Sequence, residues 1–356
     1  MRAGEEIIIE PAELVAGGAA LARIDGFPIF ATNVYPGDVA VVRLTEVKKG
    51  FARADLVRVV TPSALRRAMP CPIAEECGGC DWTALRLDAQ LEAKRRILTE
   101  SLRRIGKIYE HPPIAMHASP LNYRLRSRLR RDGDAIGFYA MRSNRVVPLA
   151  AECEVVGIET ARHPIEGQSW EIDGRLVTHG DLRIHGYHVT TDAFFQVNRH
   201  LLDTMLRLVR AHAERCKRRE VAIDLYAGVG FFTVPLAAAF RSVIAIEGSA
   251  ISIACAARNV PPNVQLVHAP VESHPIGEAD FVFLDPPRAG TRRNVIDAMA
   301  AKTRAMICFL ACDPVTFARD ASRLIASGWR LSTLDLLDLF PNTHHVETLA
   351  TFERAE

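Results

Sequence analysis

The chain has 356 residues, 49% of them hydrophobic and 24% charged, so it can bury globular cores, and this composition excludes wholesale disorder. Lys and Arg number 44 against 42 Asp and Glu, and the net charge of +2 excludes a uniformly basic, histone-like protein but permits a local basic patch. No apolar run reaches the ~20 residues of a membrane-spanning helix, and acidic residues near the start replace the apolar stretch of a signal peptide. We expect a cytoplasmic monomer of two or three domains without membrane contact.

Residues 1–60 predict a small β-barrel that binds RNA. Apolar runs at 7–9, 27–31 and 39–44 alternate with Gly and Pro turns, and a further strand is expected after residue 50. Short strands at intervals of about ten residues are typical of oligonucleotide-binding barrels. A generic β module without a ligand is the alternative.

Residues 61–190 predict a mixed α+β domain that begins with a cysteine-rich loop. Three cysteines crowd together as Cys71, Cys77 and Cys80, and the fourth is Cys153. A cytoplasmic chain of this size does not need disulfides, so such crowding indicates a metal or catalysis. Four thiolates suit zinc or an iron–sulfur cluster. Three local ligands and one distant ligand favour the cluster, because structural zinc usually shows two close pairs.

Arginines dominate the middle of this domain. Between residues 122 and 145 the chain has seven Arg and two Asp. On a strand, alternate residues share one face, which here carries Arg124, Arg126, Arg128 and Arg130. We interpret this face as a phosphate-contact surface, with a solvated charged face as the alternative. A helix expected over residues 85–104 carries more basic residues, among them Lys94, and extends the predicted surface.

Residues 191–356 predict a Rossmann-like α/β domain. Apolar, strand-length runs at 222–225, 243–246, 281–284 and 306–310 are separated by helical stretches. This alternation is typical of a doubly wound, mainly parallel sheet with helices on both faces.

The first two runs end in residues that suit a nucleoside. A Gly-x-Gly turn at 228–230 lets the backbone approach a ligand, and Glu247 is placed to accept hydrogen bonds from ribose hydroxyls. NAD would need a third glycine near Thr233 for its diphosphate, but residues 231–232 are both Phe. A nucleoside without phosphates fits better, which points to S-adenosylmethionine.

The later strands end in residues that suit catalysis. Asp285 follows one buried run and Cys312 follows the next, and ligands of such folds bind outside the carboxyl ends of the strands. Glu347 lies in an apolar, strand-like stretch near the C-terminus. Each residue also has a purely structural explanation. Asp285 could belong to a turn, Cys312 could be a small core residue, and Glu347 could be an exposed residue of an edge strand. Taken together, they predict a nucleophile and a base.

The sequence resembles the uracil-C5 RNA methyltransferases, which make 5-methyluridine in ribosomal or transfer RNA. Five motifs match in order, at residues 195–198, 224–230, 285–288, 312–314 and 345–347. The resemblance covers nearly the whole chain, because residues 4–60 resemble the TRAM domain of many members. The cysteines at 71, 77, 80 and 153 resemble the family's [4Fe–4S] site. Radical S-adenosylmethionine enzymes are a rival class, but they typically have three ligands at a different spacing.

The resemblance implies roles for individual residues. Cys312 would be the nucleophile and Glu347 the base. The contacts of S-adenosylmethionine would be Gln196, Tyr226, Gly228, Glu247 and Asp285. The chemistry explains the residue types, because uracil C5 becomes nucleophilic only after a thiolate adds to C6, and a base must then remove the C5 proton. A uracil inside an RNA helix cannot reach a buried thiol, so the target is expected to be single-stranded or flipped out.

Members with both a TRAM domain and a cluster mostly act on large-subunit ribosomal RNA, so 23S rRNA is the expected substrate and tRNA the alternative. A catalytically inactive RNA-binding protein or RNA chaperone is a second class. A DNA cytosine-C5 methyltransferase is a third, although that class usually has Pro where Ala311 precedes the thiol. Two positions depart from the family, which usually has Asn at 313 and often at 231. We expect the anion Asp313 to raise the pKa of Cys312, and Phe231 to remove a polar cofactor contact.

Overall fold

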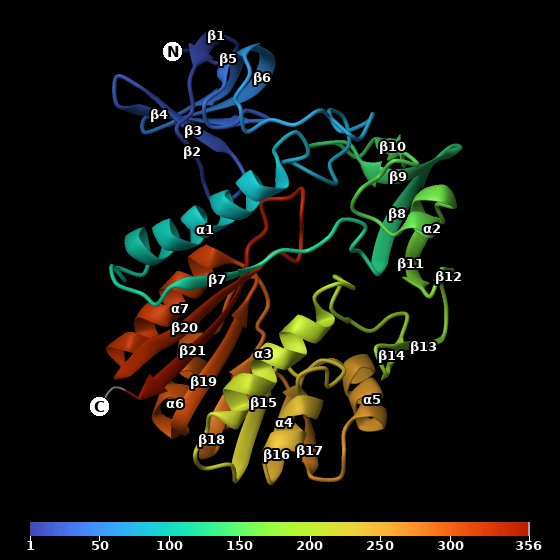
Figure 1. The fold of residues 1–356 in the computed structure, drawn as a ribbon, viewed down its shortest axis with the longest axis vertical. Coiled ribbons are helices and arrows are strands. Elements are labelled where there is room, and N and C mark those ends of the chain that lie inside the picture. Colours follow the sequence, from blue (N-terminus) through green and yellow to red (C-terminus); the bar gives the residue numbers. More distant parts are fainter. Residues whose placement is uncertain (355–356) are drawn as a thin grey trace.

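Within residues 1–354, the strands form four sheets (Figure 1). The sheets follow one another along the chain, except that β7 (Ile114–His117) joins the last sheet although it precedes the strands of the second. The structure is a computed structural model, and it describes residues 1–354. Within this range, no helix combines the length and the apolar composition needed to cross a membrane.

The N-terminal sheet has six strands, in the order β1-β5-β6-β4-β3-β2. They are β1 (Glu6–Ile9), β2 (Glu13–Leu14), β3 (Ala20–Ile24), β4 (Phe27–Thr32), β5 (Val39–Val47) and β6 (Ala52–Thr61). Small apolar residues alternate into its interior, among them Ala20, Ala31 and Val42, all fully buried. The predicted strands of this region are therefore confirmed.

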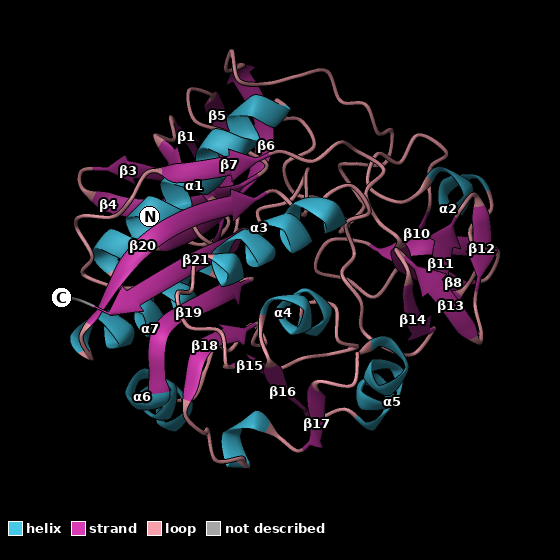
Figure 2. Cartoon of the chain, turned by 60° about the horizontal axis from the view of Figure 1, so that its bottom comes forward, coloured by secondary structure: helices cyan, strands magenta, loops and turns pink. Residues whose placement is uncertain are grey.

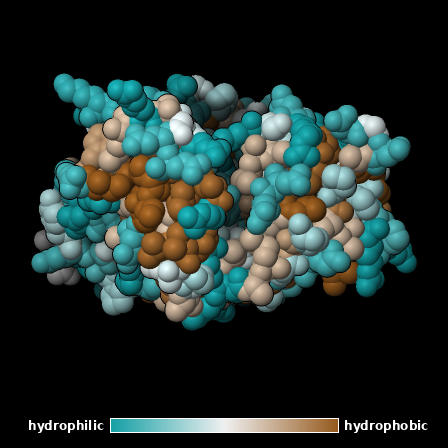
Figure 3. Space-filling view, turned by 90° about the horizontal axis from the view of Figure 1, so that it is seen from above, coloured by the Kyte–Doolittle hydropathy of each residue, from teal (hydrophilic) through white to brown (hydrophobic). Residues whose placement is uncertain are grey.

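The central sheet has five strands, in the order β10-β9-β8-β11-β12. They are β8 (Arg126–Asp132), β9 (Ala135–Tyr139), β10 (Val146–Pro148), β11 (Gly167–Ile172) and β12 (Arg175–Val177), with α2 (Ile158–Arg162) beside them. A two-stranded hairpin follows, made of β13 (Asp181–Ile184) and β14 (Tyr187–Thr190). Seen from the end that carries the N-terminal and central sheets, the surface is hollowed between these two parts (Figure 3). Residues of both parts line this hollow.

The C-terminal sheet has eight strands, in the order β17-β16-β15-β18-β19-β21-β20-β7. They are β7 (Ile114–His117), β15 (Val221–Leu225), β16 (Ser242–Glu247), β17 (Val264–His268), β18 (Ala279–Leu284), β19 (Thr303–Ala311), β20 (Trp329–Leu337) and β21 (Glu347–Arg354). Only β21 runs antiparallel to its neighbours. The doubly wound, mainly parallel sheet is thus confirmed, and it reverses its order at β15, between β16 and β18.

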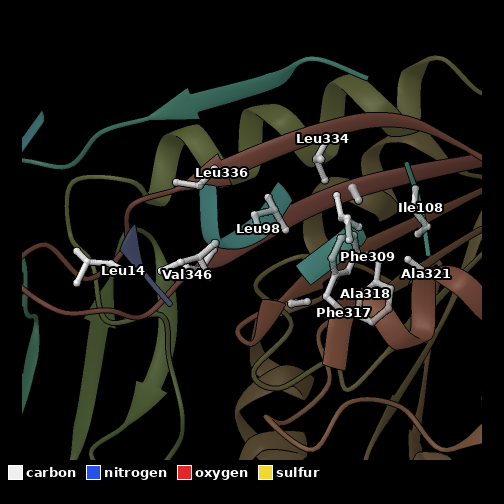
Figure 4. Packing of buried hydrophobic residues seen from close by; sticks show 14 of the residues in the cluster. Leu14, Leu98, Ile108, Phe309, Phe317, Ala318, Ala321, Leu334, Leu336 and Val346 are labelled. Carbon is white, nitrogen blue, oxygen red and sulfur yellow. The ribbon is translucent and has the colours of Figure 1, made fainter. Parts of the chain in front are cut away.

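Helices cover both faces of this sheet (Figure 2). On one face lie α3 (Leu202–Glu214), α4 (Thr233–Ala239) and α5 (Ala250–Asn259), and on the other α1 (Leu87–Arg104), α6 (Arg293–Lys302) and α7 (Pro314–Ala326), with a short 3-10 turn η1 (Val271–Ser273). Each face has its own apolar core. The core under α1 and α7 continues into the N-terminal sheet, as Leu98, Phe317 and Leu14 show in Figure 4.

Helix α1 confirms the helix expected over 85–104, but its basic residues are not free. Lys94 is fully buried, and its ammonium lies 2.6 Å from the Asp338 carboxylate. The arginines at 95 and 96 pair with Glu92, and those at 103 and 104 pair with Glu100. The prediction that Lys94 extends a basic surface is therefore wrong, because it completes a buried ion pair.

Candidate active site

A cavity of about 600 Å³ lies at the carboxyl ends of β15, β16, β18 and β19. Its volume falls in the usual range for pockets that bind small molecules. Every residue predicted to contact the cofactor or to catalyse lines it: Gln196, Tyr226, Gly228, Glu247, Asp285, Cys312 and Glu347. We call it the catalytic cavity. It lies where the strand order reverses, the usual ligand position in such folds.

The glycine turn and Glu247 form one wall of this cavity. Gly228 and Gly230 have φ angles of +56° and +86°, which glycine adopts without strain. The Gly228 N–H donates to Glu247 Oε2 at 2.8 Å, and the Ser249 N–H donates to Oε1 at 2.6 Å. These bonds hold the carboxylate at the end of β16 and leave each oxygen a free lone pair for a hydroxyl.

Asp285 is joined to Gln196 across the cavity. The Gln196 Nε2 donates to Asp285 Oδ2 at 3.1 Å. Burial raises the pKa of Asp285 to about 7, and the bond from Gln196 opposes this rise. The cavity thus carries a carboxyl group that changes its charge near neutral pH.

Cys312 and Glu347 come from adjacent strands. Cys312 directly follows β19, and Glu347 begins β21 opposite Leu337 of β20. Burial raises the pKa of Cys312 to about 12, with further contributions from the carboxyl groups of Glu347 and Asp285. Burial also raises the pKa of Glu347 well above its usual range, and the Asp285 carboxylate adds to this shift. Burial thus favours the neutral form of each group.

Arg288 is the cation that opposes these shifts. Its positive charge lowers the pKa of both Cys312 and Glu347. It also lies 3.3 Å from Nε2 of His345, and burial, His344 and Arg288 together lower the pKa of His345 to about 4. Neither Arg288 nor His345 is among the site residues predicted from the sequence. Their positions inside the motifs at 285–288 and 345–347 were the signal that could have identified them.

The two departures from the family pattern have structural explanations. Asp313 is the N-cap of α7, where its Oδ1 accepts the N–H groups of Val315 and Thr316 at 3.1 and 2.7 Å. The neighbouring anions that raise the pKa of Cys312 are instead Glu347 and Asp285. Phe231 packs against Phe195 and Tyr187 with ring centroids 5.2 Å apart, and it gives the cavity an apolar wall.

A second, smaller cavity, of about 100 Å³, also borders Cys312. It shares Arg288, Cys312 and His345 with the catalytic cavity, and it is also lined by Ala16 and Gly17 of the N-terminal part. Cys312 therefore borders two cavities.

The four cysteines predicted as ligands line one separate cavity. Cys71, Cys77, Cys80 and Cys153 surround it, together with apolar side chains such as Phe138. Within residues 1–354, no three His, Cys, Asp or Glu side chains are grouped closely enough to hold a single metal ion. A four-iron cluster is larger than one ion, so its thiolates need to share a cavity without converging on one point.

Arg124 gives an independent test of whether an anionic group fits this cavity. Its guanidinium lies over the rings of Phe138 and Tyr123, and its charge acts on Cys77 and Cys80. Its Nε is buried without a hydrogen-bond partner in the described chain. A cluster held by four thiolates is an anion, and it would compensate the positive charge of this half-buried side chain. The donor set and the charge therefore fit.

The other three predicted arginines form a surface on β8. Ser127 and Leu129 are buried, so Arg126, Arg128 and Arg130 share the opposite face, which we call the arginine face. Within residues 1–354, none of the three pairs with a carboxylate. Arg126 lies over the rings of Trp170 and Phe194, and Arg130 lies over Tyr139. Arg124 precedes the strand and lies apart from this face, beside the cysteines.

The fold and the site define a class, the Rossmann-like methyltransferases, with a thiol and a carboxyl group beside the nucleoside pocket. The profile of the tRNA (uracil-5-)-methyltransferase family matches residues 171–272 and 277–355, and that of the TRAM domain matches residues 5–57. The chain belongs to this family, and it is an RNA uracil-C5 methyltransferase.

Similar proteins span almost the whole chain. An uncharacterised RNA methyltransferase of Bdellovibrio bacteriovorus is 30% identical, over 98% of this chain and 95% of its own length. A 23S rRNA (uracil(1939)-C(5))-methyltransferase of Acidithiobacillus ferrooxidans is 28% identical, over 98% and 97%. The tRNA (uracil-54, C5)-methyltransferase of Pyrococcus abyssi, solved with S-adenosyl-L-homocysteine, has the same fold, with a TM-score of 0.73, 24% identity and coverage of 97% and 99%.

Proposed function

We propose that this protein methylates C5 of a uridine in 23S rRNA through a covalent adduct between Cys312 and C6. The observation that carries the proposal is that Cys312 and Glu347 share one cavity with the five predicted cofactor contacts. S-adenosylmethionine, when bound, supplies an electrophilic methyl group on a sulfonium. The acid-rich wall suits this cation, and Glu247 suits its ribose hydroxyls.

The chain's own residues carry the remaining steps. The Cys312 thiolate adds to C6 of uracil, which makes C5 nucleophilic. After C5 has gained the methyl group, the Glu347 carboxylate takes the proton from C5. The C5–C6 double bond re-forms as the C6–S bond breaks, and Cys312 leaves as a thiolate. A carboxyl group with a raised pKa is a stronger base once it is ionised, and Arg288 is placed to favour the ionised forms of both residues.

Cofactor affinity is expected to depend on pH through Asp285. Below its pKa of about 7, Asp285 must lose a proton before its carboxylate can face a cation. The affinity for S-adenosylmethionine should therefore rise with pH, by at most about tenfold per pH unit. S-adenosylhomocysteine lacks the sulfonium charge, so its affinity should change less. Calorimetric titrations of both ligands between pH 6 and 8 measure this. Asp285→Asn should remove the difference, and equal slopes in the unmodified protein would contradict the assignment.

We further propose that Cys71, Cys77, Cys80 and Cys153 hold a [4Fe–4S] cluster. The shared cavity supports it, as does the nearby half-buried Arg124, whose Nε has no hydrogen-bond partner in the described chain. Its role there is structural, because it would tie the loop at 71–80 to the segment around Cys153.

The arginine face is proposed to contact RNA phosphates. Arg128→Ala together with Arg130→Ala should weaken RNA binding and lower the salt dependence by roughly one to two units of slope, because two phosphate contacts are lost. Arg131→Ala is the matched control, since Arg131 pairs with Glu166 at 2.9 Å. Binding measured between 50 and 300 mM salt decides the matter. If the salt dependence of RNA binding has the same slope in the double variant and the control, these arginines form a solvated charged face and do not contact phosphates.

The choice between 23S rRNA and tRNA has a direct experiment. Labelled S-adenosylmethionine is incubated with the purified protein and with total RNA from a strain that lacks it, and the label is mapped by nuclease digestion. Label in one uridine of 23S rRNA supports the proposal, and label in tRNA favours the alternative. Absence of label from both 23S rRNA and tRNA would support an RNA-binding protein without methyltransferase activity.

A further inference from the structure

The segment that connects β20 to β21 is held by distant parts of the chain rather than by the sheet. It leaves β20 at Leu337, carries His345 and reaches Glu347 at the start of β21. In Figure 1 this red loop rises from the sheet towards α1 and the chain that follows β6. Its carbonyls accept donors from outside the sheet: Phe340 from Lys94 at 3.0 Å, Pro341 from Tyr123 at 3.4 Å, and Asn342 from the N–H groups of Asp81 and Trp82 at 3.2 and 3.0 Å.

Asn342 is the centre of these contacts. It is 1% exposed and has a φ of +66°, a conformation that Asn adopts more readily than other residues with a side chain. Its Oδ1 accepts from Arg67 at 2.9 Å and from Gln90 at 3.0 Å, while its Nδ2 donates to Glu154 at 3.0 Å. Its own N–H donates to Gln90 Oε1 at 2.7 Å. Both its backbone and its side chain are therefore fixed.

Three partners of Asn342, namely Glu154, Asp81 and Trp82, lie directly beside the cysteines at 153 and 80. Glu154 follows Cys153, and its carboxylate also pairs with Arg67 at 2.6 Å. Asp81 follows Cys80, and it contacts both the N–H of His344, at 3.0 Å, and the ring of that histidine. A continuous set of hydrogen bonds thus runs from the cysteine cavity to the residues immediately before Glu347.

We propose that Asn342 is a positioning residue that couples the cysteine segments to Glu347. It lines the cysteine cavity but not the catalytic cavity, so it acts through the backbone of residues 343–346. The role rests on the proposed function, in which Glu347 removes the C5 proton. A displacement of about 1 Å at a catalytic group costs up to roughly 100-fold in rate. The cysteine loop would then serve catalysis by holding the base in place.

The first test replaces Asn342 without disturbing its backbone. Asn342→Gly keeps the left-handed conformation and removes all three side-chain bonds. With labelled S-adenosylmethionine and total RNA, the apparent kcat should fall by about 10- to 100-fold. The KM for S-adenosylmethionine should stay within about twofold, and a protein–RNA adduct should accumulate because elimination is slowed. Asp173→Gly is the control, since Asp173 has a φ of +48° in the exposed turn between β11 and β12, and it should keep the wild-type kcat.

The second test reverses one hydrogen bond. Asn342→Asp places two carboxylates against each other, so activity should fall. Adding Glu154→Gln restores an amide opposite a carboxylate and keeps the total charge, so most of the activity should return. A general loss of folding would not be rescued by the second substitution.

Three results would overturn the proposal: an unchanged kcat in Asn342→Gly, a joint loss of melting temperature and cofactor affinity without adduct, or no rescue in the double variant. Failure of the proposed base is distinguishable. Suppose that Glu347→Gln forms no adduct, while Asn342→Gly still lowers kcat and Glu154→Gln still rescues Asn342→Asp. The base then lies elsewhere, and Asn342 still positions the segment.

Discussion

Glu347→Gln should trap the enzyme on its RNA. The amide is nearly isosteric with the carboxylate but cannot accept the C5 proton, so addition and methyl transfer proceed while elimination stalls. Turnover should fall by at least about 100-fold. The covalent protein–RNA adduct should appear as a shifted band on a denaturing gel, and it should carry the labelled methyl group.

Cys312 supplies the control for this trap. Cys312→Ala should abolish methylation while cofactor and RNA still bind, because only the covalent step is lost. The double variant Cys312→Ala, Glu347→Gln should form no adduct, since the linkage needs the thiol. Near-normal turnover by Glu347→Gln would place the base elsewhere. Asp313 would be tested next, although its carboxylate is engaged at the N-terminus of α7.

Loss of one cysteine should empty the proposed cluster site. Protein purified without oxygen should be brown and contain about four irons per chain. Cys77→Ser should lose most of this iron and lower the melting temperature, because the loop at 71–80 is then no longer tied to Cys153. Cys216→Ser is the matched control, since this buried cysteine lies outside the cavity and should keep the iron. Stoichiometric zinc in the anaerobic protein would contradict the assignment.

The sequence alone determined those features that depend on local chemistry. Periodicity and turn residues predicted the helix over 85–104 and the parallel strands at 222–225, 243–246 and 281–284, because buried strands and amphipathic helices have distinct spacings. Glu247, Asp285 and Cys312 were predicted to lie close together, because each lies at the carboxyl end of a parallel strand and these ends share one edge of the sheet. Alternation also predicted that Arg126, Arg128 and Arg130 share one face.

Only the tertiary structure decided which charges are free. Lys94 and Arg128 are both cations in basic stretches. Lys94 is buried against Asp338, whereas Arg128 is exposed and has no acidic partner among residues 1–354. Arg124 continues the alternation of β8 in sequence but lies beside the cysteines in space. Asn342 carries no motif signal of its own role, because all its side-chain partners, from Arg67 to Glu154, are remote in the chain. Local patterns encode periodicity, whereas ion pairs and buried hydrogen bonds depend on which distant segments the fold brings into contact.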